Sequence, residues 1–237
     1  MNKLSQEKLD AIRMKYENMT KTDKPNKGKD NMFWNPKEGT NTIRILPAKD
    51  DGMFFSETKI HRVQRPGMTY QNNIVCLEPT HGKGICPLCN LNRALWATKS
   101  EENITLARSI KSRDRYFANI ISREDAIPVA KVFSFGEKLL SKILCTMVDS
   151  DFGDITDWNN GYDFKVHKAI IGGYPNYDQS GARPKPSPVG SGQDIAFLKE
   201  SLHDLSVYTK TSSYEDVKAV ALELTPAEML LQISQAV

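Results

Sequence analysis

Three of the four cysteines lie close together, in the pattern Cys76-x9-Cys86-x2-Cys89. The short turn between Cys86 and Cys89 allows two thiolates to bind one ion, and Cys76 adds a third soft ligand. A structural Zn²⁺ takes four tetrahedral nitrogen or sulfur ligands, so we expect one histidine to complete the set. His61 and His81 are both near enough in sequence, and either would give a closed Cys₃His site. The pattern therefore predicts one structural zinc ion in a subdomain at about residues 59–97.

The same cysteines admit other interpretations. Cys86 and Cys89 have the spacing of a thioredoxin-like redox pair. The third cysteine and the nearby histidines argue against that interpretation, as does the lack of a βαβ pattern around them. Unpaired thiols are a further alternative, whereas a disulfide scaffold is typical of much smaller secreted chains.

Short alternating stretches predict a mainly β fold of the α+β class. Residues 42–46, 115–121, 129–133 and 164–171 alternate between apolar and polar positions, as half-buried strands do. Residues 137–147 place leucine and isoleucine at helical spacing. Strands interrupted by occasional helices at irregular intervals favour a small Greek-key barrel over a parallel α/β sheet.

Composition divides the chain into four parts. We expect a helical arm at residues 1–20, a basic linker at 21–31, a β core at 32–193 and an acidic helical segment at 194–237. Residues 172–194 are rich in Gly, Pro and Ser and predict a long mobile loop. Residues 212–215 fit a capping box at the start of a later helix. The last segment carries a net charge of −4 and the remainder +7, which favours a polyanionic partner.

Cationic and aromatic residues occur together in the middle of the chain. Cations neutralise phosphates of a single strand, while aromatic rings stack on unpaired bases. The alternative for this stretch is a solvated loop leading into a core strand, and Phe133 has the same two interpretations. Tyr116 and Phe117 point to opposite sides of a strand, so one of them at most faces a groove. The candidates are Lys111, Arg113, Arg115, Tyr116, Phe117 and Phe133.

Tyr174 and Tyr177 lie in the Gly- and Pro-rich stretch, where little else is apolar. An aromatic residue on a polar loop has no obvious role in a core, so we predict that both stack on bases. A tyrosine that closes a hairpin is the alternative.

Nothing in the sequence predicts an enzyme. Asp149, Asp151, Asp154 and Asp157 resemble a calcium loop, but glycine and aspartate occupy the wrong positions for an EF-hand. Turn formation explains these aspartates better. There is no Walker motif, nucleophile elbow or HExxH sequence. No apolar run approaches the ~20 residues that span a bilayer, so we expect a soluble, intracellular protein.

Several stretches together resemble the zinc-containing single-stranded DNA-binding (helix-destabilising) proteins of T-even and related bacteriophages. They occur in the order of that family and, with the flanking segments, the similarity covers about residues 1–220. The x9–x2 cysteine spacing and the NYDxS loop make the resemblance specific. The matching stretches are FWNPKEGTNTIRILP, CLEPTHGKGICPLC, YFANII, KVFSFGEKLLSKI and GGYPNYDQSGARPKPSP.

The resemblance implies a set of site residues. Its zinc site corresponds to His61, Cys76, Cys86 and Cys89, and thereby favours His61 over His81. Its barrel is a five-stranded OB-fold with the zinc subdomain inserted and helices at the periphery. Its N-terminal arm, which contacts the neighbouring protomer, corresponds here to Lys3 and Ser5. Its DNA cleft corresponds to Lys111, Arg113, Tyr116, Phe117, Phe133, Tyr174 and Tyr177.

The resemblance implies a protein that coats and protects single-stranded DNA during phage replication, recombination and repair. Its partners would be neighbouring protomers and phage replication and recombination proteins, in the cytoplasm of the infected bacterium. Two other classes stay open from the residues alone. One is a zinc-ribbon module that binds another protein through residues 90–97, and the other is a single-stranded RNA-binding protein. A nuclease that uses Asp149 or Asp151 is a more distant alternative.

Overall fold

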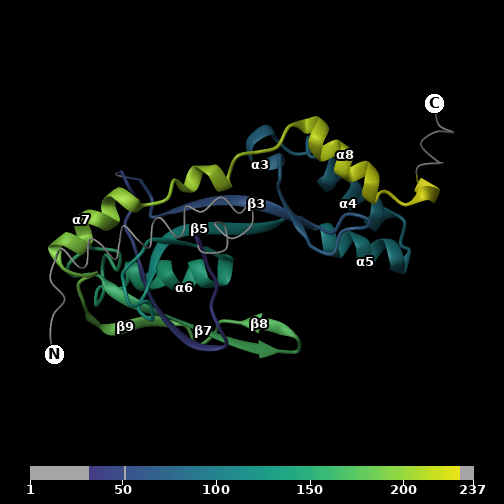
Figure 1. The fold of residues 1–237 in the computed structure, drawn as a ribbon. Helices are drawn as coiled ribbons and strands as arrows, with labels where there is room; N and C mark the ends of the chain where they lie inside the picture. Colours follow the sequence, from purple (N-terminus) through teal and green to yellow (C-terminus); the bar gives the residue numbers. More distant parts are fainter. Residues whose placement is uncertain (1–31, 51, 230–237) are drawn as a thin grey trace. The chain divides into compact units, whose positions relative to one another are not determined.

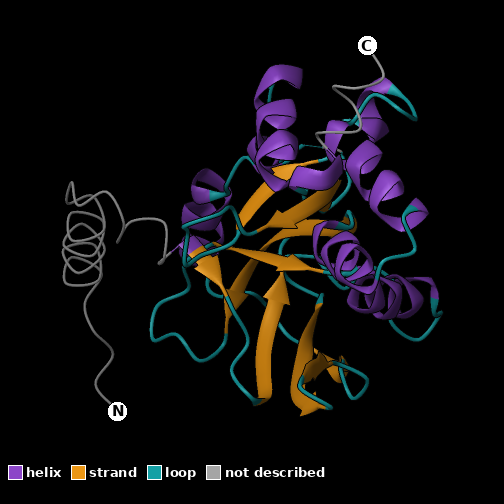
Figure 2. Ribbon diagram, turned by 90° about the vertical axis from the view of Figure 1, so that its right-hand side faces the viewer, coloured by secondary structure: helices purple, strands orange, loops and turns teal. Residues whose placement is uncertain are grey.

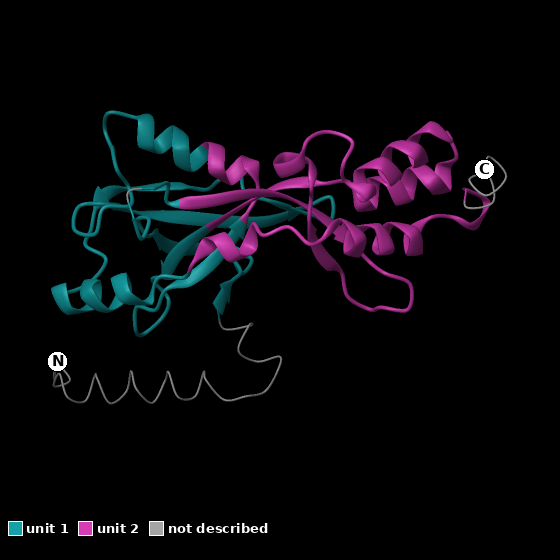
Figure 3. Cartoon of the chain, turned by 90° about the horizontal axis from the view of Figure 1, so that it is seen from above, with its two compact units in different colours: residues 1–54, 118–134, 142–203 teal, residues 55–117, 135–141, 204–237 magenta. Residues whose placement is uncertain are grey.

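The computed structural model describes residues 32–50 and 52–229, which form two compact units. Among the described residues, unit 1 contains residues 32–50, 52–54, 118–134 and 142–203, and unit 2 contains residues 55–117, 135–141 and 204–229 (Figure 3). The predicted arm and linker, with Lys3 and Ser5, lie outside the described residues. Within the predicted acidic segment, residues 194–203 belong to unit 1 and residues 204–229 to unit 2, and the predicted domain boundaries stay a prediction.

Unit 1 is built on an antiparallel sheet. The central strand β2 (Gly39–Ile45) pairs with the end of β5 (Arg113–Ser122) on one side and with β7 (Tyr162–Ile171) on the other. Alternation places Ile43, Phe164 and Val166 in the core, all fully buried. A short strand β1 (Phe33–Trp34) runs parallel to β6 (Lys131–Phe135). All four predicted strands thus lie within three residues of their observed bounds.

The predicted mobile loop contains regular structure. Strands β8 (Tyr174–Asn176) and β9 (Gly181–Pro186) both pair with β7 (Figure 1). Gly172 and Gly173 join β7 to β8 with φ values of 59° and 81°, as a tight hairpin turn requires. A capping box between Ser191 and Asp194 then begins helix α7 (Gly192–Ser201). The loop prediction was therefore wrong for most of this stretch.

The strand pairings of unit 1 leave the sheet open. Within the described residues, the order runs β1-β6-β5-β2-β7-β8, and its two ends are not paired with each other. The mixed α+β class is confirmed, whereas a closed five-stranded barrel is not seen. Figure 2 shows the strands in orange and the helices in purple. The helix α6 (Glu137–Val148) matches the predicted helix closely.

Unit 2 combines a strand pair with several helices. Strand β3 (Phe55–Val63) pairs antiparallel with β4 (Asn72–Val75), followed by α3 (Glu78–His81), α4 (Pro87–Ala97) and α5 (Glu101–Ile110). The 3-10 helix η1 (Leu205–Tyr208) and helix α8 (Tyr214–Leu224) complete it. Ser213 caps α8 through the Asp216 amide, one residue later than the predicted box.

The core of unit 2 surrounds the cysteine cluster. Helix α4 contributes Leu88, Leu91 and Leu95, and α8 contributes Val217 and Val220 to the same apolar cluster. None of the helices among the described residues is long and apolar enough to cross a membrane.

Candidate metal centre and nucleic-acid interface

Four side chains from three elements converge in the core of unit 2. His61 lies near the C-terminal end of β3, and Cys76 directly follows β4. Cys86 is the N-cap residue of α4 and Cys89 lies in its first turn, since Pro87 begins the helix immediately after Cys86. All four are buried, and their ligand atoms lie within 4.8 Å of one another.

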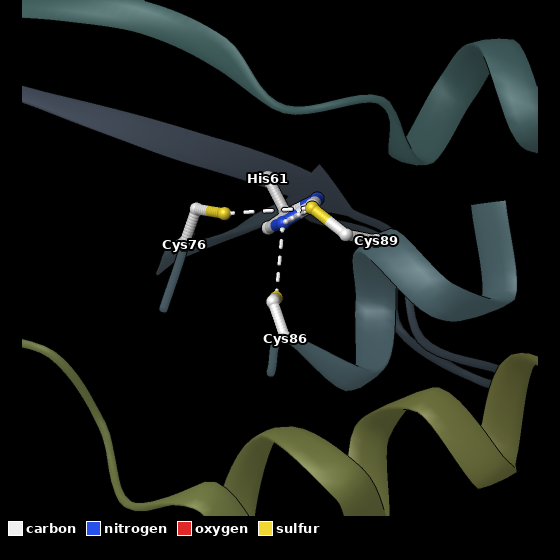
Figure 4. A group of neighbouring side chains, drawn as sticks. All are labelled: His61, Cys76, Cys86 and Cys89. Atoms are coloured by element: carbon white, nitrogen blue, oxygen red, sulfur yellow. Dashed lines mark hydrogen bonds between the residues drawn. The ribbon is translucent and has the colours of Figure 1, made fainter. Parts of the chain in front are cut away.

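The side chains point toward a common centre (Figure 4). His61 Nε2 lies 3.5 Å from Cys86 Sγ and 3.6 Å from Cys89 Sγ, and Cys76 Sγ lies 3.5 Å from Cys89 Sγ. The residues therefore offer one nitrogen and three sulfur ligands to a single metal ion. His81, the other candidate, is exposed at the end of α3 and is not part of the cluster. The cluster that could hold a metal ion therefore contains His61 and not His81.

The second nitrogen of His61 fixes the orientation of the ring. His61 Nδ1 lies 2.7 Å from the carbonyl oxygen of Ile110, the last residue of α5. When Nδ1 carries the proton and donates it to this carbonyl, Nε2 keeps its lone pair directed at the thiols. Histidine ligands of metals are commonly held in this way.

Burial and close contact perturb the protonation of the cluster. Burial lowers the pKa of His61, but hydrogen bonds from the imidazole to thiols and to the Ile110 carbonyl outweigh it and raise that pKa to about 10. Hydrogen bonds with Cys76 and Cys89 hold the pKa of Cys86 far below its usual range, whereas hydrogen bonds with Cys76 and Cys86 raise the pKa of Cys89. Without a cation the four groups must share protons, which a bound metal ion would displace.

The aspartates after α6 form turns. Three of these carboxylates each accept a hydrogen bond from the backbone amide two residues ahead. The donors are the amides of Asp151, Thr156 and Asn159, and the acceptors are Asp149, Asp154 and Asp157 respectively. These are Asx-turns, as the sequence predicts. Within the described residues, the Cys₃His cluster is the one group of metal-ligating side chains that comes together.

The predicted cationic segment runs from the end of α5 into β5, in unit 2. Lys111 and Arg113 are exposed, and Arg115 and Tyr116 are half-buried. Phe117 is only 5% exposed, and its ring stacks on Tyr208 at a centroid distance of 5.0 Å. Of the two adjacent rings, Tyr116 is therefore the one with surface to offer a base.

Phe133 lies in unit 1 and is also buried, at 3% exposure. Its ring meets Trp34 edge to face, 4.8 Å between centroids. The burial of Phe117 and Phe133 favours packing roles for both. A stacking role for these two rings has no support in the structure.

Tyr174 is the most exposed aromatic of the predicted set, at 78%. It opens β8 and pairs across the hairpin with Ile171, which is itself 62% exposed. Tyr177 is half-buried, and its carbonyl accepts a hydrogen bond from the Ser180 amide. The hairpin thus presents an apolar tip to solvent, whereas the exposed cations Lys165 and Arg183 lie where β7 pairs with β9, away from the turn.

One polar group of unit 1 was missed by the sequence analysis. Arg44, which is fully buried, and Arg123 both contact the same carboxylate oxygen of Asp163, at 3.1 and 2.9 Å. Arg44 also donates to Ser187, and Arg123 donates to the Pro188 and Val189 carbonyls. We call these three charged residues the Arg–Asp–Arg cluster. It borders an open polar pocket of about 460 Å³ lined by Thr42, Arg123, Glu124, Asp163, Arg183, Ser187 and Pro188.

Comparison with known proteins gives one match. A protein-family model described as gp32 DNA binding protein like matches residues 37–225. The matched range includes every residue of the Cys₃His cluster and every predicted DNA-binding residue. No curated protein matches the chain.

Proposed function

Because the chain belongs to the gp32 DNA-binding-protein-like family, we propose that it binds single-stranded DNA without sequence specificity and coats it. The observation that carries this proposal is the family match across both units. Tyr174 adds geometric support, because a ring that is 78% exposed beside a hairpin turn suits an unpaired base.

The mechanism follows from what each kind of residue can contact. Lys111, Arg113 and the cations beside β7 neutralise phosphates, which every sequence presents equally. Tyr116 and Tyr174 stack on bases, which are accessible in a single strand but not in a duplex. The protein therefore binds single strands more tightly than duplexes, and mass action then opens hairpins as binding proceeds.

We further propose that the metal is one structural Zn²⁺. Zinc bonds of about 2.3 Å to sulfur and 2.0–2.1 Å to nitrogen, at tetrahedral angles, separate sulfur from nitrogen by about 3.6 Å and sulfur from sulfur by about 3.8 Å. The observed sulfur–nitrogen separations of 3.5 and 3.6 Å fit, as does the sulfur–sulfur separation of 3.5 Å. Four protein ligands leave no open position, so the ion would stabilise the fold of unit 2 without taking part in a reaction.

The biological setting is part of the same proposal. The resemblance to phage helix-destabilising proteins supports a non-enzymatic role in phage replication, recombination and repair, in the cytoplasm of the infected bacterium. It also supports contacts between protomers along the DNA, through Lys3 and Ser5, and with other phage replication proteins. An OB-fold core is the architecture that this family relationship favours.

Titration of labelled single-stranded and duplex DNA at two salt concentrations tests the proposal. We expect tight, salt-sensitive binding to the single strand and much weaker binding to the duplex. The slope against salt, about 0.7 per phosphate for a single strand, counts the cationic contacts. Equal, weak binding to both forms would contradict the proposal and favour a protein-interaction module. Tighter binding to a matched RNA would show that RNA is the target.

The Tyr174→Ala variant tests the stacking contribution. Loss of one stacked base costs about 1–3 kcal/mol, so we expect affinity for single strands to fall at least fivefold with an unchanged salt slope. Tyr214→Ala is a matched control, because Tyr214 is a tyrosine 47% exposed at the start of α8, far from β8 in sequence. Equal losses in the two variants would argue against a specific role for Tyr174.

A further inference from the structure

A small pocket on unit 2 has Tyr116 as part of its wall. Its volume is about 190 Å³, below the 300–1,000 Å³ typical of sites for whole small molecules. A cavity of this size suits a single planar ring. Its lining comes from β3, from α3 and from the start of β5, and consists of Glu57, Thr58, Lys59, Pro79, Asp114 and Tyr116.

Strand alternation brings the charged groups of this pocket beside the tyrosine. Glu57 and Lys59 lie on the same side of β3 as Phe55, whose ring meets Tyr116 edge to face at 5.7 Å. On β5, Asp114 and Tyr116 likewise share one side, and Asp114 lies 3.6 Å from the Lys59 ammonium. The two strands therefore present two carboxylates, one ammonium and one aromatic ring to the same space.

The pocket carries net negative charge, whereas a phosphate binds to positive charge. Lys59 compensates Asp114, whereas no cation lies within ion-pair distance of Glu57 in the part of the chain that the structure describes. Burial raises the pKa of Tyr116, and the negative charges of Asp114, Glu57 and Glu137 raise it further. A backbone phosphate would be repelled here, whereas an uncharged base would not be, and the Tyr116 ring in the lining offers a base a surface to stack on.

We propose that this pocket receives one nucleobase, which stacks on Tyr116 and donates hydrogen bonds from an exocyclic amino group to Glu57 or Asp114. Cytosine, adenine and guanine carry such a group, whereas thymine presents a carbonyl oxygen where cytosine has its amino group. The pocket therefore discriminates against thymine. This inference rests on the proposed binding of single-stranded DNA, to which it adds a bias in base composition.

Competition between matched oligo(dC) and oligo(dT) tests the inference, with Glu57→Gln as the main variant. Removal of a negative charge raises affinity for every DNA, so the informative quantity is the ratio of the dC affinity to the dT affinity. We expect this ratio to fall about fivefold in Glu57→Gln, the effect of losing a base contact at the weak end of the usual range. Asp114→Asn, measured in the same way, should lower the ratio as well.

Glu200→Gln is the matched control, since Glu200 is an exposed acid on α7 in unit 1. It should change both affinities equally and leave the ratio unaltered. If both pocket variants bind the two oligomers with the wild-type ratio, the inference is overturned while the proposed function stands. If the wild-type protein binds neither oligomer, the proposed function itself fails. Metal content and circular dichroism of each variant confirm that the fold is retained.

Discussion

Each unit contains a polar cluster that joins segments far apart in sequence, and the two clusters differ in chemistry. In unit 2, His61 and three cysteines offer a set of ligands that suits one metal ion. In unit 1, Arg44 and Arg123 share Asp163 and bind backbone carbonyls around residues 187–189. The Cys₃His cluster needs a bound ion to use its four ligand atoms, whereas in the Arg–Asp–Arg cluster the charged groups pair with each other and with backbone carbonyls of the same chain. We therefore expect the stability of unit 2 to depend on a bound metal ion and the stability of unit 1 to depend on its own ion pairs.

The largest effect should come from removing a metal ligand. Structural zinc contributes about 10–16 kcal/mol of apparent binding free energy in small zinc domains, which exceeds the stability of most whole domains. Cys86→Ser should therefore abolish stoichiometric zinc binding and remove the cooperative unfolding of unit 2. Calorimetry with metal analysis measures both.

Cys145→Ser provides the control for that variant. Cys145 is an exposed free cysteine on α6, outside the cluster, so its replacement should change neither zinc content nor the unfolding transition. A normal transition in metal-free Cys86→Ser would show that unit 2 is stable without the ion.

The next largest loss of stability should come from disrupting the Arg–Asp–Arg cluster. Asp163→Asn removes the negative charge that two guanidinium groups share, one of which is fully buried. Breaking a buried pair in this way costs about 3–5 kcal/mol, and the partial exposure of Arg123 places the expected loss near the lower limit. Denaturant unfolding measures it.

Asp125→Asn breaks an ion pair of the same unit, with Lys131 at 2.7 Å, where both side chains are partly exposed. Its loss should cost about 0–1 kcal/mol. Equal losses in Asp163→Asn and Asp125→Asn would mean that the Arg–Asp–Arg cluster acts as an ordinary surface pair.

The smallest effect should come from the surface pair of Arg65 and Glu223. The Arg65 guanidinium forms two hydrogen bonds with the Glu223 carboxylate, at 2.7 and 2.5 Å, and these hold the pKa of Glu223 below its usual range. A lowered pKa in the folded state stabilises the protein above the unfolded-state pKa, and that stabilisation is lost as the pH falls through the folded-state pKa. Glu223→Gln should therefore lower the melting temperature slightly at neutral pH, with the difference vanishing in acid. A difference that grows in acid would contradict this sign.

The same contrast explains what could be predicted from sequence. The metal ligands were predictable because thiols at the x9–x2 spacing have few other uses, and three of the four ligands lie close together in the chain. The Arg–Asp–Arg cluster was not predictable, because Arg44 lies at a polar position of an alternating strand and its partner Asp163 is 119 residues away. A solvent-exposed arginine would give the same local pattern.

The stretch from residue 172 to 194 shows a second limit. Its Gly, Pro and Ser content indicated a loop, yet β8 and β9 form there because β7 supplies their hydrogen-bond partners. Pairing of this kind has no local signal in the sequence. Burial was equally hard to predict at Phe117, since Tyr208, the ring that covers it, comes from a distant segment.

Because α8 is part of the core of unit 2, that core cannot be completed until this helix has been synthesised. The metal ligands have all been translated by residue 89, but Val217, Val220 and Ala221 belong to the same apolar cluster as the cysteines. During synthesis on the ribosome, a metal ion can therefore bind these four residues well before α8, which packs in the same apolar cluster, has been translated. Early capture of a metal ion would hold β3 and α4 together through that interval, and α8 would then complete the apolar cluster around the site.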